Sequence, residues 1–177
     1  MNPISNPIAL VTGGSRGIGA QIAQRLAQDG FTVAVNYTSN PAAADEVVAP
    51  ITADGGKAFA VQADISDAAA VAAMFDDIAK RGDLTVLVNN AGIMSLAPIA
   101  EMDSGVFERM LSINLLGSFN TMQQAAKHMV AGGRVINTSS SVTKRLQPTY
   151  GPYAATKAAL EAMSVVFARE LRGRSIT

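Results

Sequence analysis

Short apolar runs recur along the chain, and each is followed by a polar or glycine-containing turn. Because the runs contain almost no charged residue, they are typical of strands that are buried on both faces, as in a parallel sheet. Strands are predicted at five places, namely Ile8–Val11, Thr32–Asn36, Ala58–Gln62, Leu84–Val88 and Val135–Thr138. The pair Ile176–Thr177 is interpreted as the first part of another strand.

Between these runs, apolar residues return every three or four positions, which is the period of a helix with one buried face. Helices are predicted over Ala20–Asp29, Pro41–Ala53, Asp67–Lys80, Asp103–Val130 and Tyr150–Leu171, and Ser66 is predicted to cap the third of them. Alternating strands and helices are typical of α/β domains. We therefore predict a doubly wound parallel sheet with helices on both faces, in a single domain over residues 1–177.

The composition limits the classes of function. The 14 basic and 14 acidic residues balance, so net charge does not favour a nucleic acid or an acidic membrane surface as a partner. The chain has no cysteine and one histidine, and no metal site is predicted. The segment Met1–Pro7 has no basic start, and no apolar stretch approaches the length of a membrane span. We expect a soluble, cytoplasmic protein without a membrane or nucleic-acid partner.

The first predicted strand runs directly into the glycine-rich stretch Thr12–Gly19, and a predicted helix follows. Glycines let a backbone approach a phosphate closely, and a helix start offers free N–H groups and a positive dipole end. A Walker loop would need lysine where Ala20 stands, and the Gly-x-Gly-x-x-Gly form would need glycine or alanine where Ile22 stands. The remaining pattern, Gly-x-x-x-Gly-x-Gly, predicts a pyrophosphate site, although a glycine-rich helix start without a ligand remains an alternative. The candidate ligands are Gly13, Ser15, Arg16, Gly17, Ile18 and Gly19, of which Ile18 also falls on the apolar face of the helix.

The end of the second predicted strand bears on the choice of dinucleotide. An acidic residue about 20 positions after the glycine loop would hold the ribose 2′-hydroxyl of NAD, but Tyr37 stands near that place, and no acid occurs from Phe31 to Ala44. Without that carboxylate a 2′-phosphate is not repelled, and a guanidinium is a suitable ligand for it. The sequence therefore favours NADP(H), bound by Arg16 with Asn36, Tyr37 and Thr38 nearby. The alternative is that Arg16 is a solvated loop charge.

Two further stretches follow predicted strands at the edge of the sheet where ligands bind in open α/β folds. Asp64, with Ile65 beside it, follows the third strand, where its carboxylate can accept a hydrogen bond from an adenine amino group or cap a turn. Asn90, Ala91 and Gly92 follow the fourth strand and are also candidate cofactor ligands. A turn without a ligand would use the same residue types.

A catalytic constellation is predicted around the last helix. Tyr153 and Lys157 are four residues apart, so a helix places them on one face, and the ammonium favours the ionised form of the phenol. Ser140 lies thirteen residues earlier, just after a predicted strand, and can hydrogen-bond the same substrate oxygen. Asn114 lies in an apolar helical stretch, where its amide must be satisfied. It binds either a neighbouring strand or a catalytic water.

With these residues in hand, the chain resembles the short-chain dehydrogenase/reductase family along nearly its whole length. The family's Thr-Gly-x-x-x-Gly-x-Gly loop corresponds to Thr12–Gly19, its Asn-Asn-Ala-Gly to Asn89–Gly92, and its Tyr-x-x-x-Lys to Tyr153–Lys157. Asn114 and Ser140 fall at the other two positions of the catalytic tetrad. Tyr150 does not fit, because Ala154 stands four residues after it.

The resemblance implies a Rossmann-like fold and an NADP(H)-dependent oxidoreductase. It implies that a hydride passes between the nicotinamide and a carbonyl or secondary alcohol, that Tyr153 is the general acid and base, and that Ser140 holds the substrate oxygen. Lys157 would bind the nicotinamide ribose and join a proton relay through water near Asn114. Bacterial 3-oxoacyl-acyl-carrier-protein reductases are similar members, and the family implies a homo-oligomer, a dimer or tetramer, formed through the helices Asp103–Val130 and Tyr150–Leu171.

The departure from the family is at the C-terminus. Family members usually continue through a further strand, a turn that touches the nicotinamide, a substrate lid and a last strand, and we expect the 177 residues to be a fragment or the ordered part of a longer protein. The rival function is a catalytically silent NADP-binding sensor or interaction domain.

Overall fold

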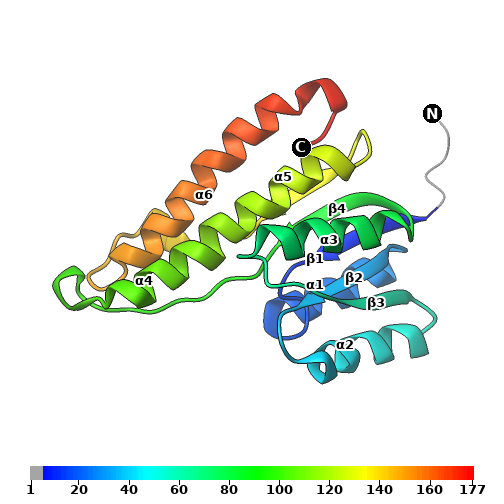
Figure 1. The fold of residues 1–177 in the computed structure, drawn as a ribbon, viewed down its shortest axis with the longest axis horizontal. Helices are drawn as coiled ribbons and strands as arrows, with labels where there is room; N and C mark the ends of the chain where they lie inside the picture. The colour runs from blue at the N-terminus through cyan, green and yellow to red at the C-terminus, as the bar shows by residue number, and fades with distance from the viewer. Residues whose placement is uncertain (1–5) are drawn as a thin grey trace.

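Five parallel strands form one sheet in the computed structural model, which describes residues 6–177 (Figure 1). The strands are β1 (Pro7–Val11), β2 (Thr32–Tyr37), β3 (Lys57–Gln62), β4 (Asp83–Asn89) and β5 (Arg134–Asn137), in the spatial order β3-β2-β1-β4-β5. Each lies within one residue of its predicted bounds at both ends. The predicted parallel sheet is therefore confirmed, while the prediction for Met1–Pro7 falls mostly outside the described residues.

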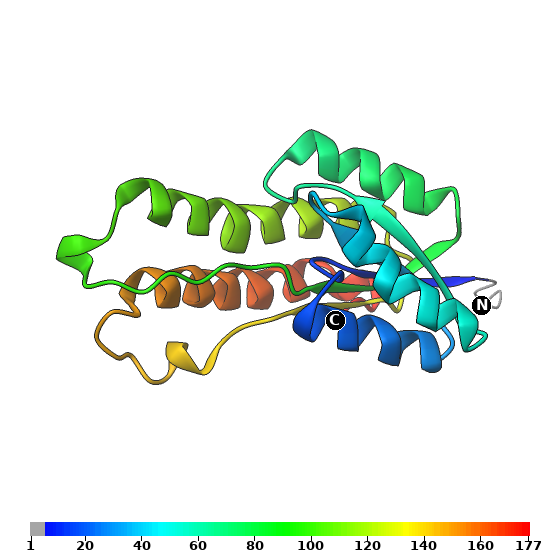
Figure 2. The same cartoon turned by 90° about the horizontal axis from the view of Figure 1, so that it is seen from below.

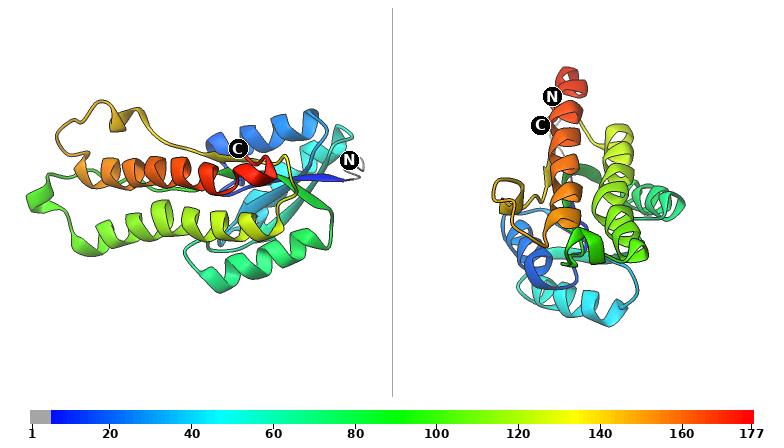
Figure 3. Two further views of the ribbon diagram at one scale, coloured as in Figure 1. Left: turned by 90° about the horizontal axis from the view of Figure 1, so that it is seen from above. Right: turned by 90° about the vertical axis from the view of Figure 1, so that its left-hand side faces the viewer.

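Helices cover both faces of this sheet, as predicted (Figures 2 and 3). They are α1 (Gly17–Gln28), α2 (Pro41–Ala53), α3 (Ala68–Ala79), α4 (Ser104–Leu111), α5 (Ser118–His128) and α6 (Gly151–Glu170). The predicted helix over Asp103–Val130 consists of α4 and α5 joined by a π-helical segment, Ser112–Gly117. Short 3₁₀ turns occur at Ile99–Glu101, Ser141–Thr143 and Arg172–Arg174.

Two apolar layers hold the sheet between the helices. In β1, Ile8 and Leu10 belong to the layer that contains Phe75 of α3, whereas Val11 belongs to the layer that contains Val47 of α2. Successive strand residues point to opposite faces. Both sides of β1 are therefore buried, which is why its sequence reads as one apolar run instead of an alternation.

Two local predictions were wrong. The cap of α3 is Asp67 and not Ser66, because the Asp67 carboxylate accepts hydrogen bonds from the backbone N–H groups of Ala69 (2.8 Å) and Ala70 (3.2 Å). Ile18 was expected on the buried face of α1 but is 70 % exposed. It is the second residue of α1 and still belongs to the glycine loop motif.

The outer edge of β5 is occupied by the last residue of the chain. The backbone N–H of Val135 donates to the carbonyl of Thr177 (2.8 Å), and the N–H of Thr177 donates to the carbonyl of Gly133 (3.2 Å). This is the hydrogen-bond pattern of a parallel pair, although Ile176–Thr177, predicted to begin another strand, form no strand in the structure. Across residues 6–177, no helix combines the length and the apolar character that a membrane crossing needs.

Candidate active site

The glycine loop between β1 and α1 has a backbone shape that only small residues allow. Gly13 and Gly17 have φ values of 58° and 55°, in the left-handed region that favours glycine. A Cβ added at Gly19 would collide with the carbonyl oxygen of Gly13 and would lie 2.5 Å from the side-chain nitrogen of Asn90. The loop thus presents bare backbone at the carboxyl end of the sheet, as a bound pyrophosphate requires.

Like α5 and α6, α1 begins without the side-chain cap that α2, α3 and α4 have. Asn40 caps α2 by accepting from Ala43 N–H (3.3 Å), and Asp103 caps α4 by accepting from Val106 N–H (3.0 Å). In α1 the N-cap is Arg16, whose side chain makes no capping bond within the described residues, and the first turn carries no acid. Its N–H groups and the guanidinium suit an anion. The other predicted phosphate ligands, Ser15, Gly17, Ile18 and Gly19, lie at or beside this helix start.

The two predicted cofactor segments lie against each other. The side chain of Asn90 donates to the carbonyl oxygens of Thr12 (3.0 Å) and Gly13 (3.2 Å), and the N–H groups of Asn90 and Ala91 donate to the Thr12 hydroxyl (3.1 Å each). A Cβ at Gly13 would lie 3.0 Å from the Ala91 Cα. Asn90 and Thr12 therefore hold the shape of the glycine loop.

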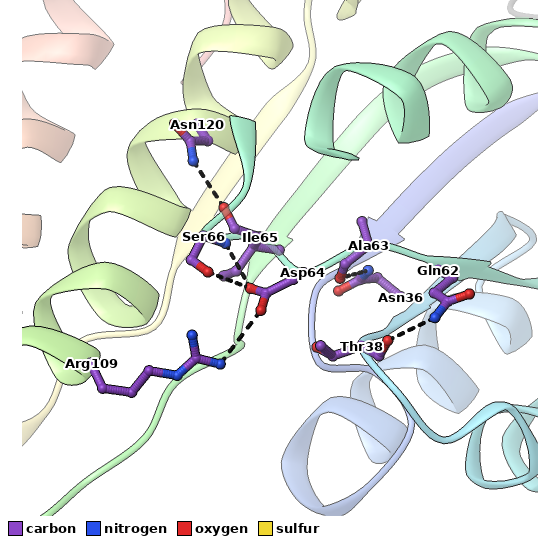
Figure 4. Close-up of polar contacts among 9 residues, drawn as sticks. All are labelled: Asn36, Thr38, Gln62, Ala63, Asp64, Ile65, Ser66, Arg109 and Asn120. Atoms are coloured by element: carbon purple, nitrogen blue, oxygen red, sulfur yellow. Dashed lines mark hydrogen bonds and ion pairs between the residues drawn. The ribbon is translucent and has the colours of Figure 1, made fainter. Parts of the chain in front are cut away.

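Asn36, a predicted ligand of the 2′-phosphate, is buried, and Figure 4 shows its side chain directed at Ala63. Only 1 % of the residue is exposed, and its amide accepts from the N–H of Gly13 (3.2 Å) and donates to the carbonyl of Ala63 (3.1 Å). The amide thus joins the glycine loop to the end of β3, and its contribution to a cofactor site is to hold those two backbones together.

The polar side chains that remain open beside the end of β2 come from its last residue and the loop after it. Tyr37 is half-buried and Thr38 is exposed, and the Thr38 carbonyl accepts a hydrogen bond from the Gln62 side chain (3.0 Å), as Figure 4 shows. Arg16 is exposed at the start of α1. The edge thus keeps polar and basic groups in solvent reach, with no acidic residue in the loop from Thr38 to Asn40.

Asp64 caps a turn, which is one of the two roles predicted for it from the sequence. Its Oδ1 accepts from the N–H (2.9 Å) and hydroxyl (2.6 Å) of Ser66, and its Oδ2 lies 3.4 Å from the Arg109 guanidinium (Figure 4). The Ser66 hydrogen bond, opposed by desolvation and aided by Arg109, holds the pKa of Asp64 below its ordinary value. Ile65 is buried, and its carbonyl accepts from Asn120 (2.9 Å). The adenine contact of Asp64 stays a prediction.

Asn114 lies in the π-helical segment and joins three parts of the chain. Its amide donates to the carbonyl of Ile93 (2.8 Å) and accepts from the N–H of the same residue (2.8 Å), and it also donates to the Thr156 hydroxyl (3.2 Å). The segment after β4, which Figure 2 shows passing in front of α6, is thereby tied to both the π-helical segment and α6. Both N–H donors of the Asn114 amide and one lone pair of its oxygen are used in this connection.

Lys157 is a buried cation beside Tyr153. The residue is 4 % exposed, and its ammonium donates to the carbonyl of Thr138 (2.7 Å) and lies 5.9 Å from the centre of the Tyr153 ring. A Cβ at Gly92 would be 3.7 Å from the ammonium nitrogen. Burial lowers the pKa of Lys157. The predicted pairing of a phenol and an ammonium on one face of α6 is thus present in the structure.

Ser140 begins the short turn that follows β5. Its backbone is extended, and its hydroxyl accepts from the N–H of Val142 at 3.4 Å. The neighbouring Ser139 hydroxyl instead donates to the carboxylate of Glu161 (2.5 Å). Of these two serines, Ser140 is the one whose hydroxyl is free to donate to a substrate.

The predicted catalytic residues come from the π-helical segment, the turn after β5 and α6, and Gly92, which follows β4, lies close to both Asn114 and Lys157. Sequence reasoning missed three side chains that hold segments of the site: Thr12 binds Asn90 and Ala91, Thr156 binds Asn114, and Glu161 binds Ser139. The sequence positions of two of these residues could have indicated a role in the site, because Thr12 begins the glycine motif and Glu161 follows Lys157 by one helical turn.

Residues 7–177 match the short chain dehydrogenase family. The chain belongs to the short-chain dehydrogenase/reductase family. The predicted membership and the Rossmann-like doubly wound fold are thereby confirmed.

Relatives in this family cover nearly all of the chain. An uncharacterized oxidoreductase of Methylorubrum extorquens is 47 % identical over 177 residues, which are 99 % of this chain and 71 % of the relative. The 3-oxoacyl-acyl-carrier-protein reductase of Staphylococcus aureus is 42 % identical over 172 residues, 96 % of this chain and 70 % of its own length. The similarity to such reductases was also predicted.

A solved short-chain dehydrogenase of Burkholderia cenocepacia, in complex with NADP, superimposes with a TM-score of 0.91 at 43 % identity. The match covers 96 % of this chain and 70 % of that one. All three relatives are thus longer than the 177 residues described by this sequence.

Proposed function

We propose that this short-chain dehydrogenase/reductase catalyses NADP(H)-dependent hydride transfer to and from a carbonyl or secondary alcohol carbon, with Tyr153 as general acid and base. The observation that carries the proposal is the buried Lys157 ammonium, 5.9 Å from the Tyr153 ring and bonded to the Thr138 carbonyl. The ammonium places a positive charge beside the phenol that would exchange a proton with the substrate oxygen. The same phenol, once protonated, donates to a carbonyl oxygen.

NADP(H) is the cofactor that the sequence predicted and that the related Burkholderia structure contains. The residues of this chain fit it, because the Gly13–Gly19 loop exposes backbone at an uncapped helix start and Arg16 is free to meet a 2′-phosphate. When bound, NADPH supplies the hydride. Backbone N–H groups at the start of α1 would hold its pyrophosphate, and Lys157 would hold the nicotinamide ribose.

The remaining members of the site act on the substrate oxygen and on proton supply. Ser140 donates a hydrogen bond to that oxygen, which stabilises its negative charge while Tyr153 delivers the proton. Because the Asn114 side chain is occupied by Ile93 and Thr156, its contribution is to fix the segment beside Lys157, where a water completes the proton relay. The substrate class is an aldehyde or ketone in one direction and an alcohol in the other.

We also propose that the protein is a homo-oligomer that pairs through α5 and α6, which lie side by side in Figures 1 and 3. A groove of about 610 Å³ lies between them. It is lined mostly by apolar side chains, including Phe119, Met122, Ala126, Met163, Val166 and Phe167. Burial of such a surface against a second copy is favoured by the hydrophobic effect.

The test of catalysis is the replacement of Tyr153 by phenylalanine. We expect Tyr153→Phe to abolish the oxidation of NADPH by carbonyl compounds such as ethyl acetoacetate, by a factor of about 10² or more, because the proton donor is lost. NADPH affinity, measured by calorimetric titration, should change little.

The matched control is Tyr150→Phe, three residues earlier, since Ala154 and not a lysine follows it by four positions. This variant should keep the wild-type rate. If Tyr153→Phe retained turnover, the proposed acid and base would be wrong, and if the wild type bound NADPH without reducing any carbonyl probe, the silent NADP-binding alternative would be favoured.

A further inference from the structure

Glu161 holds the segment on both sides of Ser140. The Ser139 hydroxyl donates to Glu161 Oε1 (2.5 Å), and the Thr143 hydroxyl lies 2.8 Å from the same oxygen. The second carboxylate oxygen lies 3.5 Å from the ammonium of Lys144. Ser140 is thus enclosed between two residues that a single carboxylate binds.

The contacts of the Thr143 hydroxyl extend to the backbone of Ser140 itself. This hydroxyl lies 3.0 Å from the Ser140 carbonyl oxygen as well as 2.8 Å from Glu161, so its one proton is shared between the two acceptors. The N–H of Thr143 also donates to the Ser140 carbonyl (3.2 Å), and the N–H of Val142 donates to the Ser140 hydroxyl (3.4 Å). The carboxylate, the turn Ser141–Thr143 and Ser140 therefore form one hydrogen-bonded unit.

The place of Glu161 on α6 connects this unit to the other catalytic groups. Tyr153, Lys157 and Glu161 follow one another at intervals of four residues, so they lie along one side of the helix. Lys157 binds the carbonyl of Thr138, and Glu161 binds the next residue, Ser139. Two successive turns of α6 thus bind Thr138 and Ser139, the two residues before Ser140.

The charge state of Glu161 suits this task. The hydrogen bond from Ser139, followed by that from Thr143, holds the pKa of Glu161 below its ordinary value, with Lys144 acting in the same direction against desolvation. At neutral pH the carboxylate is therefore ionised and only accepts hydrogen bonds, which both hydroxyls can satisfy.

We propose that Glu161 is a positioning residue, which sets the place of the Ser140 hydroxyl relative to Tyr153 by fixing residues 139–143 on α6. The proposal rests on the proposed function in so far as it concerns catalysis. Its physical basis is that a hydrogen-bond donor stabilises a substrate oxygen only when its geometry is held by a rigid support. The helix that carries the phenol also carries that support.

The first test is hydrogen exchange in the folded 177-residue chain. Glu161→Ala should speed exchange at the N–H groups of Val142 and Thr143 by about tenfold, because charge-assisted bonds that order their turn are lost. Glu161→Gln keeps an acceptor oxygen and should restore most of the protection. The control, Glu46→Ala, removes an exposed carboxylate of α2 and should leave this turn unchanged. Unchanged exchange in Glu161→Ala would overturn the proposal.

The second test is kinetic, with ethyl acetoacetate as the probe substrate. Glu161→Ala should lower kcat by about tenfold at constant NADPH affinity, and Glu161→Gln should recover it to within about threefold. In a Ser140→Ala background, Glu161→Ala should cause little further loss, because its effect passes through Ser140. An equal loss in both backgrounds would refute positioning of Ser140. A wild type without activity would instead refute the proposed function, while exchange at Val142 and Thr143 would still decide whether Glu161 holds the turn.

Discussion

At the scale of single residues, we propose that the choice of cofactor depends on the guanidinium of Arg16. Of the groups predicted around the 2′-phosphate, Asn36 is buried and uses its amide on Gly13 and Ala63, whereas Arg16 is exposed at the start of α1. The charge of Arg16 is therefore available to a ligand. The first turn of α1 adds no acidic residue that would compete for it.

We predict that Arg16→Ala weakens NADPH binding by about tenfold or more and changes NADH binding much less, since a charge-assisted bond to phosphate is lost. Calorimetric titration with both nucleotides measures this. Arg25→Ala is the control, because Arg25 is exposed on the same helix and pairs with Asp29. Equal affinities of the wild type for the two nucleotides would contradict the role given to Arg16.

At the scale of elements, α5 depends at both ends on residues distant in sequence. Its start follows the π-helical segment in which Asn114 binds Ile93, and its end is held by Arg174, whose guanidinium donates to the carbonyls of Ala126 and Met129. Carbonyl groups at a helix end lack intrahelical partners, and a cation there also complements the helix dipole. Arg174, in the 3₁₀ turn Arg172–Arg174, thus caps the C-terminal end of α5.

Arg174→Ala should lower the free energy of unfolding by about 1–3 kcal/mol, because the last carbonyls of α5 lose a charged donor. Urea unfolding followed by circular dichroism measures the change. Arg172→Ala is the matched control, as it removes an exposed arginine from the same turn and should stay within about 0.5 kcal/mol of the wild type. Equal stability of the two variants would show that Arg174 does not cap the helix.

At the scale of the whole molecule, a groove with a mostly apolar lining remains open between α5 and α6. Phe119 of α5 and Val166 of α6 are 43 % and 53 % exposed, and both line this groove. The groove between them continues the apolar lining around Phe119 and Met163. A monomer would keep this surface in water, which is why a second copy is the partner that we propose.

Val166→Lys should convert the oligomer to a monomer, because it places an unpaired charge in the proposed interface. Sedimentation velocity measures the change in mass. Leu146→Lys, which alters an exposed leucine in the loop after β5, is the control and should leave the assembly intact. A wild type that sediments as a monomer at all concentrations would contradict the proposed pairing.

The sequence by itself determined the strands, the helices that follow them, the glycine loop and the Tyr153–Lys157 pair. Each of these depends on residues within a few positions of one another: an apolar run, a helical period, a glycine pattern or a four-residue interval. Such local patterns can be recognised without knowledge of contacts between distant parts of the chain. For the same reason the family could be identified from motifs before any geometry was known.

Only the tertiary structure decided which polar groups are already occupied and which remain free for a ligand. Thr12 binds Asn90 across 78 positions, and Ser139 binds Glu161 across 22, so no local pattern indicates either pair. Packing likewise buried Asn36 and exposed Ile18, against expectation for both. The physical reason is that a buried polar group must find a partner, and the fold alone determines which partner lies within reach.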